Sequence, residues 1–159
     1  MSKEKRDYTK IIIAIIVLIL IDQIIKVAVI NIGDKTIIPE ILNFSISRNV
    51  GGTYGVSSNS TVTYVLTNLI VVAIAFKFIT SQNQFIDKKI KVFLTLVIAG
   101  GLSNCIDRIF RGYVVEFIQI MKLPIFNFAD ICILVGWVSM VAIFASFSAK
   151  ELKNRKRKW

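Results

Sequence analysis

Four long apolar stretches constrain the fold of this chain more than any other feature. They cover residues 11–30, 61–79, 90–110 and 128–147. Each approaches the ~20 residues that a helix needs to cross the hydrocarbon core of a bilayer. Because the remaining segments are short, we expect a single membrane domain over residues 1–159. The predicted class is an all-α polytopic membrane protein with four transmembrane helices. The first stretch lacks a small-residue cleavage site, and we interpret it as a retained helix.

The net charge of +10 is concentrated in three basic clusters, which predict the orientation of the chain. With four spans, all three clusters fall on one side, which the positive-inside rule assigns to the cytoplasm. We therefore expect both termini to be cytoplasmic and the basic tail to contact membrane lipids, with no nucleic-acid partner. The clusters are Lys3, Lys5, Arg6 and Lys10; Lys88, Lys89 and Lys91; and Lys150, Lys153, Arg155, Lys156, Arg157 and Lys158.

The composition argues against the common zinc sites. The chain has no histidine, and its two cysteines, Cys105 and Cys132, stand alone inside apolar spans. Zinc sites require clustered cysteine and histidine ligands. We expect no metal, no cofactor and no structural disulfide.

The segment over residues 31–60 is predicted to form a small extracytoplasmic cradle that contains β-structure. Leu42, Phe44 and Ile46 alternate with polar residues, which is the period-two pattern of a half-buried strand. The sequence then reads Arg48-Asn49-Val50-Gly51-Gly52-Thr53-Tyr54-Gly55. Three glycines in five positions allow a tight turn or a close approach of the backbone to a ligand.

Several polar residues interrupt the apolar spans. Asp22 and Lys26 are four residues apart on the first helix, so they share a face and can form an ion pair. A structural pair is the simpler interpretation, and a proton or ion relay is the alternative. Gly101, Asn104 and Arg108 line one stripe of the third helix, where they could pack helices together or donate to a ligand. Asp107, next to Arg108, is predicted to be its local charge partner.

Glu116 and Asp130 form the strongest candidate for a catalytic pair. Glu116 follows the third apolar stretch and Asp130 opens the fourth, with Pro124 between them as a helix breaker. An up-and-down chain would bring both carboxyl groups to one membrane level. Two close carboxyl groups share one proton, so one can activate water while the other protonates a carbonyl or a leaving amine. The alternative is that both simply face water.

Five motifs in order resemble those of the lipoprotein signal peptidases, also called signal peptidase II. Asp22-Gln23-Ile24-Ile25-Lys26 is similar to the Asp and Lys of the family's first helix. The other four motifs resemble its Arg-Asn-x-Gly, Gly-Gly-x-x-Asn-x-x-Asp-Arg, Gly-x-Val-Val-Asp-Phe and Phe-Asn-x-Ala-Asp segments. They are Arg48-Asn49-Val50-Gly51, residues 100–108, residues 112–117 and residues 126–130.

The resemblance implies an intramembrane aspartic-type endopeptidase of the bacterial cytoplasmic membrane, with its site near the outer leaflet. Its substrate would be a diacylglyceryl-modified prolipoprotein, cleaved just before the lipidated cysteine to remove the signal peptide. By position, Glu116 and Asp130 are the catalytic residues. Asn49, Gly51, Asn104, Arg108 and Asn127 match substrate-binding positions, whereas Asp22, Lys26, Gly101 and Asp107 match supporting ones.

The chain departs from the family pattern close to the predicted site. The family has aspartate at the position of Glu116, and it usually has Gly-Ala-Ala-Phe where this chain has Gly51-Gly52-Thr53-Tyr54. An added methylene moves the carboxyl group by about a bond length, and a misplacement of about 1 Å can lower a rate roughly a hundredfold. A second hypothesis is therefore a weakened paralogue that binds prolipoprotein or a mimicking peptide antibiotic without turnover. A third is a small transporter or proton-conducting protein.

Overall fold

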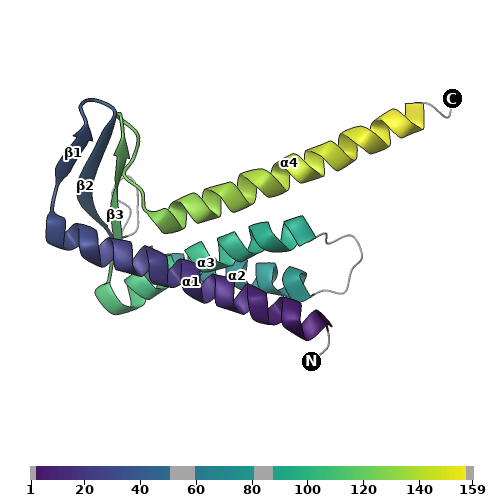
Figure 1. Cartoon of the computed structure of the whole chain (residues 1–159), viewed down its shortest axis with the longest axis horizontal. Coiled ribbons are helices and arrows are strands. Elements are labelled where there is room, and N and C mark those ends of the chain that lie inside the picture. The colour runs from purple at the N-terminus through teal and green to yellow at the C-terminus, as the bar shows by residue number, and fades with distance from the viewer. Residues whose placement is uncertain (1–2, 51–59, 81–87, 157–159) are drawn as a thin grey trace.

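The computed structural model describes residues 3–50, 60–80 and 88–156 as four helices and one small sheet. Figure 1 shows the sheet at one end of the helices, whereas both ends of the chain lie at the other. In chain order the elements are α1 (Lys3–Ile32), β1 (Lys35–Ile38), β2 (Leu42–Asn49), α2 (Ser60–Thr80), α3 (Lys88–Arg111), β3 (Val114–Ile120) and α4 (Phe128–Lys156).

All four helices are long and apolar enough to cross a membrane, as the sequence predicts. The candidate spans are Asp7–Ile32, Val62–Thr80, Lys88–Arg111 and Phe128–Asn154. In α3, 67% of the most apolar stretch is buried, against 17% or less in the other three helices. The helix α3 is therefore the centre of the bundle, and the exposed apolar faces of α1, α2 and α4 suit contact with lipid.

Close packing of α4 on α3 depends on two glycines. A Cβ atom at Gly100 would lie 2.4 Å from the carbonyl oxygen of Ala129, and one at Gly136 would lie 2.7 Å from that of Phe93. Backbone atoms at these distances cannot move aside without shifting a helix. The two glycines therefore let the backbones of α3 and α4 approach each other, as small residues do in membrane helix pairs.

Two further glycines end the helices that lead into the sheet. Gly33 follows α1 with φ of 79°, and Gly112 follows α3 with φ of 80°. Their N–H groups donate to the carbonyl oxygens of Val29 and Arg108 at 2.9 and 3.2 Å, respectively. A left-handed residue at this position is the usual glycine stop of a helix. After each of these glycines the chain continues as a strand, β1 after α1 and β3 after α3.

The sheet is antiparallel, in the order β1-β2-β3. Its strand β2 confirms the strand predicted from Leu42, Phe44 and Ile46. Two further strands, at residues 35–38 and 114–120, were not predicted from the sequence. Glu116 lies within β3, paired with Ser47 of β2, and not at the end of a membrane helix. The run 114–120 was missed because its partner strand is far away in the sequence.

Candidate active site

The first turn of α4 holds Asp130 in a reciprocal cap. The N–H of Asp130 donates to Oδ1 of Asn127 at 2.8 Å, and the N–H of Asn127 donates to Oδ2 of Asp130 at 3.1 Å. This is the geometry of a capping box, in which the residue before a helix and the third residue inside it satisfy each other's backbone. The same contacts fix the direction of the Asp130 carboxyl group.

Asn104 of α3 holds the second oxygen of Asp130. Its Nδ2 donates to Oδ1 of Asp130 at 2.8 Å. Its Oδ1 accepts from Nζ of Lys26 at 3.2 Å and from Nδ2 of Asn127 at 3.1 Å. Because two donors occupy the amide oxygen, the amide cannot rotate without losing both bonds. Lys26 therefore determines which end of the Asn104 amide faces Asp130.

Glu116 approaches this group from the sheet. Nδ2 of Asn49 donates to its Oε1 at 2.7 Å, across the β2–β3 pair. Burial raises the pKa of Glu116, the Asn49 bond lowers it, and the charge of Asp130 raises it again. The charges of Arg108 and Lys26 lower it. The two acids therefore interact electrostatically, as two carboxyl groups in one site do.

Asn127 connects the two carboxyl-bearing elements directly. Its Nδ2 donates to the carbonyl oxygen of Val115, the residue before Glu116, at 3.1 Å. The same residue caps Asp130, and its side chain is fully buried. One asparagine thus joins the strand that carries Glu116 to the helix that carries Asp130.

A buried charge cluster supports the site from the α1 side. Nζ of Lys26 lies 2.7 Å from Oδ2 of Asp22 and 2.8 Å from Oδ2 of Asp107, and Asp107 also pairs with Arg111. The two acids and two bases balance in formal charge. Lys26, Asp22 and Asp107 are at most 1% exposed. A buried charge carries a large desolvation penalty, which pairing with opposite charges offsets here.

The cluster also binds backbone groups of the two elements that carry the acids. Oδ1 of Asp22 accepts from the N–H of Ala129 at 2.9 Å, which satisfies a free donor in the first turn of α4. Oδ2 of Asp107 accepts from the N–H of Val115 in β3 at 3.1 Å. The cluster therefore fixes both elements to α1 and α3.

Arg108 places a cation beside the two acids without an ion pair to either in the described part of the chain. Its guanidinium lies 5.2 Å from the ring centre of Tyr64 in α2, within the range of a cation–π contact. Its Nε is buried and has no partner among the described residues. A buried donor without a partner beside two acids is suited to bind a ligand.

The structure brings most of the predicted residues together. Asn104, Asn127 and Asp130 share one hydrogen-bonded group, and Asn127 also bonds to the carbonyl oxygen of Val115, next to Glu116. Asn49 bonds to Glu116, and Asp22 and Lys26 form the expected ion pair. Gly51 lies outside the described residues. Gly101 lies where α2 packs on α3, since a Cβ there would be 3.1 Å from Cγ2 of Val72.

One predicted contact is wrong, and three residues of the buried cluster were missed, namely Arg111, Gln23 and Ser103. Asp107 pairs with Lys26 and Arg111, and not with the adjacent Arg108, because neighbours on a helix point about 100° apart. The spacing of four between Asp107 and Arg111 was the signal for that pair. Gln23 was also missed; it donates to Oγ of Ser103 at 2.9 Å and to Oδ1 of Asp107 at 3.0 Å.

The arrangement suits acid–base hydrolysis by paired carboxyl groups. It offers two acids that interact electrostatically, three asparagine amides and an arginine N–H that has no partner among the described residues. Within residues 3–50, 60–80 and 88–156, no three histidine, cysteine, aspartate or glutamate side chains gather as a metal site would require.

Comparisons with known proteins agree on one family. Residues 14–147 match the family described as Signal peptidase (SPase) II. Proteins named lipoprotein signal peptidase from Staphylococcus aureus strains JH9 and Newman are 34% identical, over 94% of this chain and 93% of theirs. Two solved structures, both described as a bacterial membrane enzyme, are similar. One is 25% identical with a TM-score of 0.79 over 89% of this chain and 91% of its own. The other is 26% identical with a TM-score of 0.78, over 86% and 92%.

Proposed function

The chain belongs to the signal peptidase II family, and on that premise we propose that Glu116 and Asp130 are its catalytic pair. The enzyme is an aspartic-type lipoprotein signal peptidase, and it removes the signal peptide from prolipoproteins. The observation that supports the assignment best is the position of Asn127, which bonds to both Asp130 and the residue before Glu116. We further propose that the whole chain works as one membrane domain.

The hydrogen bonds suggest which acid holds the proton before reaction. Both oxygens of Asp130 accept N–H donors, from Asn104 and Asn127, which is the arrangement that an ionised carboxylate prefers. Asp130 also lies in the first turn of α4, where the helix dipole favours negative charge. Glu116 accepts a single amide N–H, from Asn49, among the described residues. We therefore assign the base to Asp130 and the acid to Glu116.

The reaction then follows from these two protonation states. Asp130 takes a proton from a water molecule as its oxygen attacks the scissile carbonyl carbon, while Glu116 gives its proton to the carbonyl oxygen. As the C–N bond breaks, Asp130 gives the proton it took from water to the leaving nitrogen. The hydroxyl group formed on the former carbonyl carbon returns its proton to Glu116 as the carbonyl forms again, so both acids regain their starting states. The products are a carboxylic acid at the end of the signal peptide and a free amine on the lipidated cysteine.

The neighbouring donors would bind the substrate backbone. Arg108 has a buried N–H without a partner among the described residues, and Asn49 lies on the face of the sheet that carries Glu116. Asn104 and Asn127 would hold the carboxylate and its surroundings in place. Gly51 is assigned to substrate binding from its motif alone, and Asp22, Lys26, Gly101 and Asp107 to support.

The basic clusters support an orientation with the sheet outside the cell. Both ends of the chain lie at the end of the bundle opposite the sheet (Figure 1), and the basic residues are concentrated there. By the positive-inside rule that end is cytoplasmic. We propose that the carboxyl pair lies near the outer leaflet of a bacterial cytoplasmic membrane, where a diacylglyceryl-modified prolipoprotein would present its cleavage site.

The direct test is cleavage by the purified protein in detergent or lipid nanodiscs. We expect a diacylglyceryl-modified prolipoprotein to be cut just before its lipidated cysteine, and the unmodified precursor to be cut far more slowly. Mass spectrometry of the products identifies the bond. Tight binding of the modified precursor without any product would instead support the weakened paralogue, and proton flux through proteoliposomes without substrate would support the transporter.

The pH profile of cleavage should report the proton on Glu116. Activity falls at high pH when Glu116 loses its proton, and burial places that loss above the ordinary pKa of a glutamate. The Asn49 bond stabilises the ionised form and lowers this pKa. In Asn49→Ala the alkaline limb of the profile of kcat/KM should therefore move to higher pH.

Asn43→Ala provides the matched control for this shift. Asn43 lies on the same strand but is paired with Gln119, away from Glu116. Its removal should leave the alkaline limb in place. If the alkaline limb of Asn49→Ala is unchanged or moves to lower pH, the proton whose loss ends activity belongs to a group other than Glu116.

A further inference from the structure

Arg108 of α3 is held by two contacts, and neither of them is with an acid. Its guanidinium carbon lies 5.2 Å from the ring centre of Tyr64 in α2. Its Nη1 donates to the carbonyl oxygen of Asn104, one turn earlier on its own helix, at 3.5 Å. Its Nε is buried and has no partner among the described residues. The ring of Tyr64 is therefore the contact from another helix that fixes the guanidinium group.

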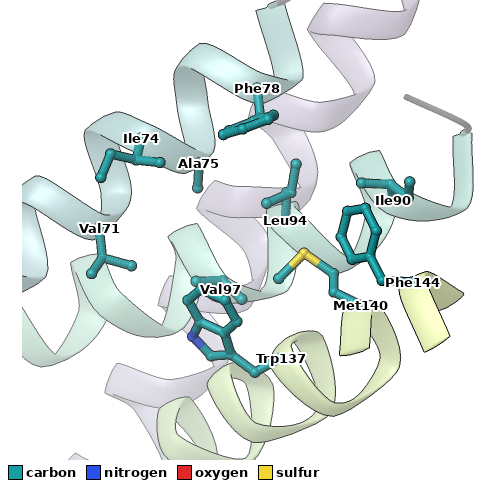
Figure 2. A pocket seen from close by; sticks show the side chains of 10 residues that line it. All are labelled: Val71, Ile74, Ala75, Phe78, Ile90, Leu94, Val97, Trp137, Met140 and Phe144. Atoms are coloured by element: carbon teal, nitrogen blue, oxygen red, sulfur yellow. The ribbon is translucent and has the colours of Figure 1, made fainter. Parts of the chain in front are cut away.

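The packing of α2 on α3 gives Tyr64 its place. Val71 and Ala75 of α2 line the same apolar cavity as Leu94 and Val97 of α3 (Figure 2). Tyr64 precedes Val71 by seven residues, which is nearly two helical turns. Both side chains therefore lie on the face of α2 that meets α3, and the ring is set beside Arg108 by the backbone of α2.

Acidic groups surround Arg108 from several elements. The charge of Arg108 interacts with three carboxyl groups, and a cysteine thiol lies beside it on its own helix. The lysine of the buried cluster acts on both proposed catalytic acids as well. These groups are Asp107 and Cys105 of α3, Glu116 of β3, Asp130 of α4 and Lys26 of α1.

Glu116 is the acid that retains acceptor capacity for Arg108. Asp107 already pairs with two bases, and both oxygens of Asp130 accept N–H donors. Glu116 accepts a single amide N–H, from Asn49, among the described residues. A cation–π contact and a partly solvated ion pair have similar strengths, so the ring can decide which of the two Arg108 makes.

We propose that Tyr64 is a positioning residue whose ring keeps the guanidinium group of Arg108 out of an ion pair with Glu116. The inference rests on the proposed function, in which Glu116 holds the proton before reaction and Arg108 donates to the substrate backbone. An ion pair between Arg108 and Glu116 would stabilise the ionised form of the acid. It would also occupy the N–H groups that bind substrate. The ring thus preserves both the proton and the donors.

The test weakens the attraction of the ring without changing its shape. Tyr64→Phe retains the ring, and phenylalanines with one, two or three ring fluorines at this position have progressively less electron density on the face. We expect the alkaline limb of the kcat/KM profile to move to lower pH with each fluorine, by about half a pH unit in total. The sign follows because the charge of Arg108 lowers the pKa of Glu116. At the optimum, kcat/KM should fall about threefold to tenfold.

Tyr113 provides the matched control, because its ring centre also lies 5.2 Å from a guanidinium carbon, that of Arg48. Arg48 pairs with Val115, on the opposite face of the sheet from Glu116. The same fluorinated residues at position 113 should leave the alkaline limb in place. A limb that does not move in the series at position 64, or that moves equally in both series, would overturn the assignment.

A second measurement follows the proton on Glu116 without any cleavage. The infrared band of its protonated carboxyl group is identified by its loss in Glu116→Gln and is titrated in the wild type and in the trifluorinated variant at position 64. We expect a lower midpoint pH in that variant, and an unchanged or higher midpoint would contradict the role of the ring. A wild type that cuts no precursor but shows this shift would refute the proposed function while supporting the restraint of Arg108 by Tyr64.

Discussion

Replacing Asp130 by asparagine is expected to lower the rate of prolipoprotein cleavage at least about a thousandfold, because an amide cannot take a proton from water. The substitution should lower the free energy of unfolding only modestly by comparison with this loss of rate. Asp130 accepts one N–H at each oxygen, from Asn104 and from Asn127. The asparagine keeps one acceptor, and its NH₂ meets the other donor. Because Lys26 and Asn127 hold the Asn104 amide, that amide cannot turn to relieve the conflict.

The control for Asp130→Asn is the same change at Asp34. Oδ1 of Asp34 accepts from the N–H of Ile46 at 2.7 Å in an exposed part of the sheet. Asp34→Asn should leave the cleavage rate within about twofold of the wild type, since no reacting group is nearby. Thermal melting of both variants separates lost catalysis from lost fold. Undiminished cleavage by a folded Asp130→Asn protein would remove this residue from the mechanism.

The helices of this fold could be predicted from the sequence because their signals are local. A run of about twenty apolar residues defines a membrane helix without reference to any other part of the chain. The same holds for Asp22 and Lys26, whose spacing of four places them on one face of α1. Alternation of apolar and polar residues likewise located β2.

The contacts that assemble the site could not be predicted in this way, because they join distant segments. The sequence gives no indication that Val115 donates to Asp107, or that Ala129 donates to Asp22. Strand β3 reads Val-Val-Glu-Phe-Ile-Gln-Ile, a short apolar run that periodicity alone cannot assign. Its partner β2 lies far earlier in the chain, and that pairing places Glu116 beside Asn49.

Glu116 is the main departure from the family pattern, and the structure gives it a definite partner. Its Oε1 receives the Asn49 amide at 2.7 Å, while the asparagines and the arginine around it are the residue types that the family motifs contain. The longer side chain of Glu116 is therefore surrounded by the same types of hydrogen-bond donor that the family motifs contain. The effect of the extra methylene on turnover depends on where the Glu116 carboxyl group meets the scissile carbonyl oxygen.

Two substitutions at Glu116 answer this question together. Glu116→Gln keeps an oxygen for Asn49 but cannot release a proton, so we expect cleavage to fall at least about a hundredfold. Glu116→Asp keeps an acid and retracts it by about 1.5 Å, one C–C bond. Since the surrounding donors match the family, we expect this variant to cleave at or above the wild-type rate. The measurement is single-turnover cleavage of the lipidated precursor. If Glu116→Asp is inactive while the wild type is active, the residues around position 116 are arranged for the longer side chain of glutamate. If Glu116→Gln is active, residue 116 is not the proton donor.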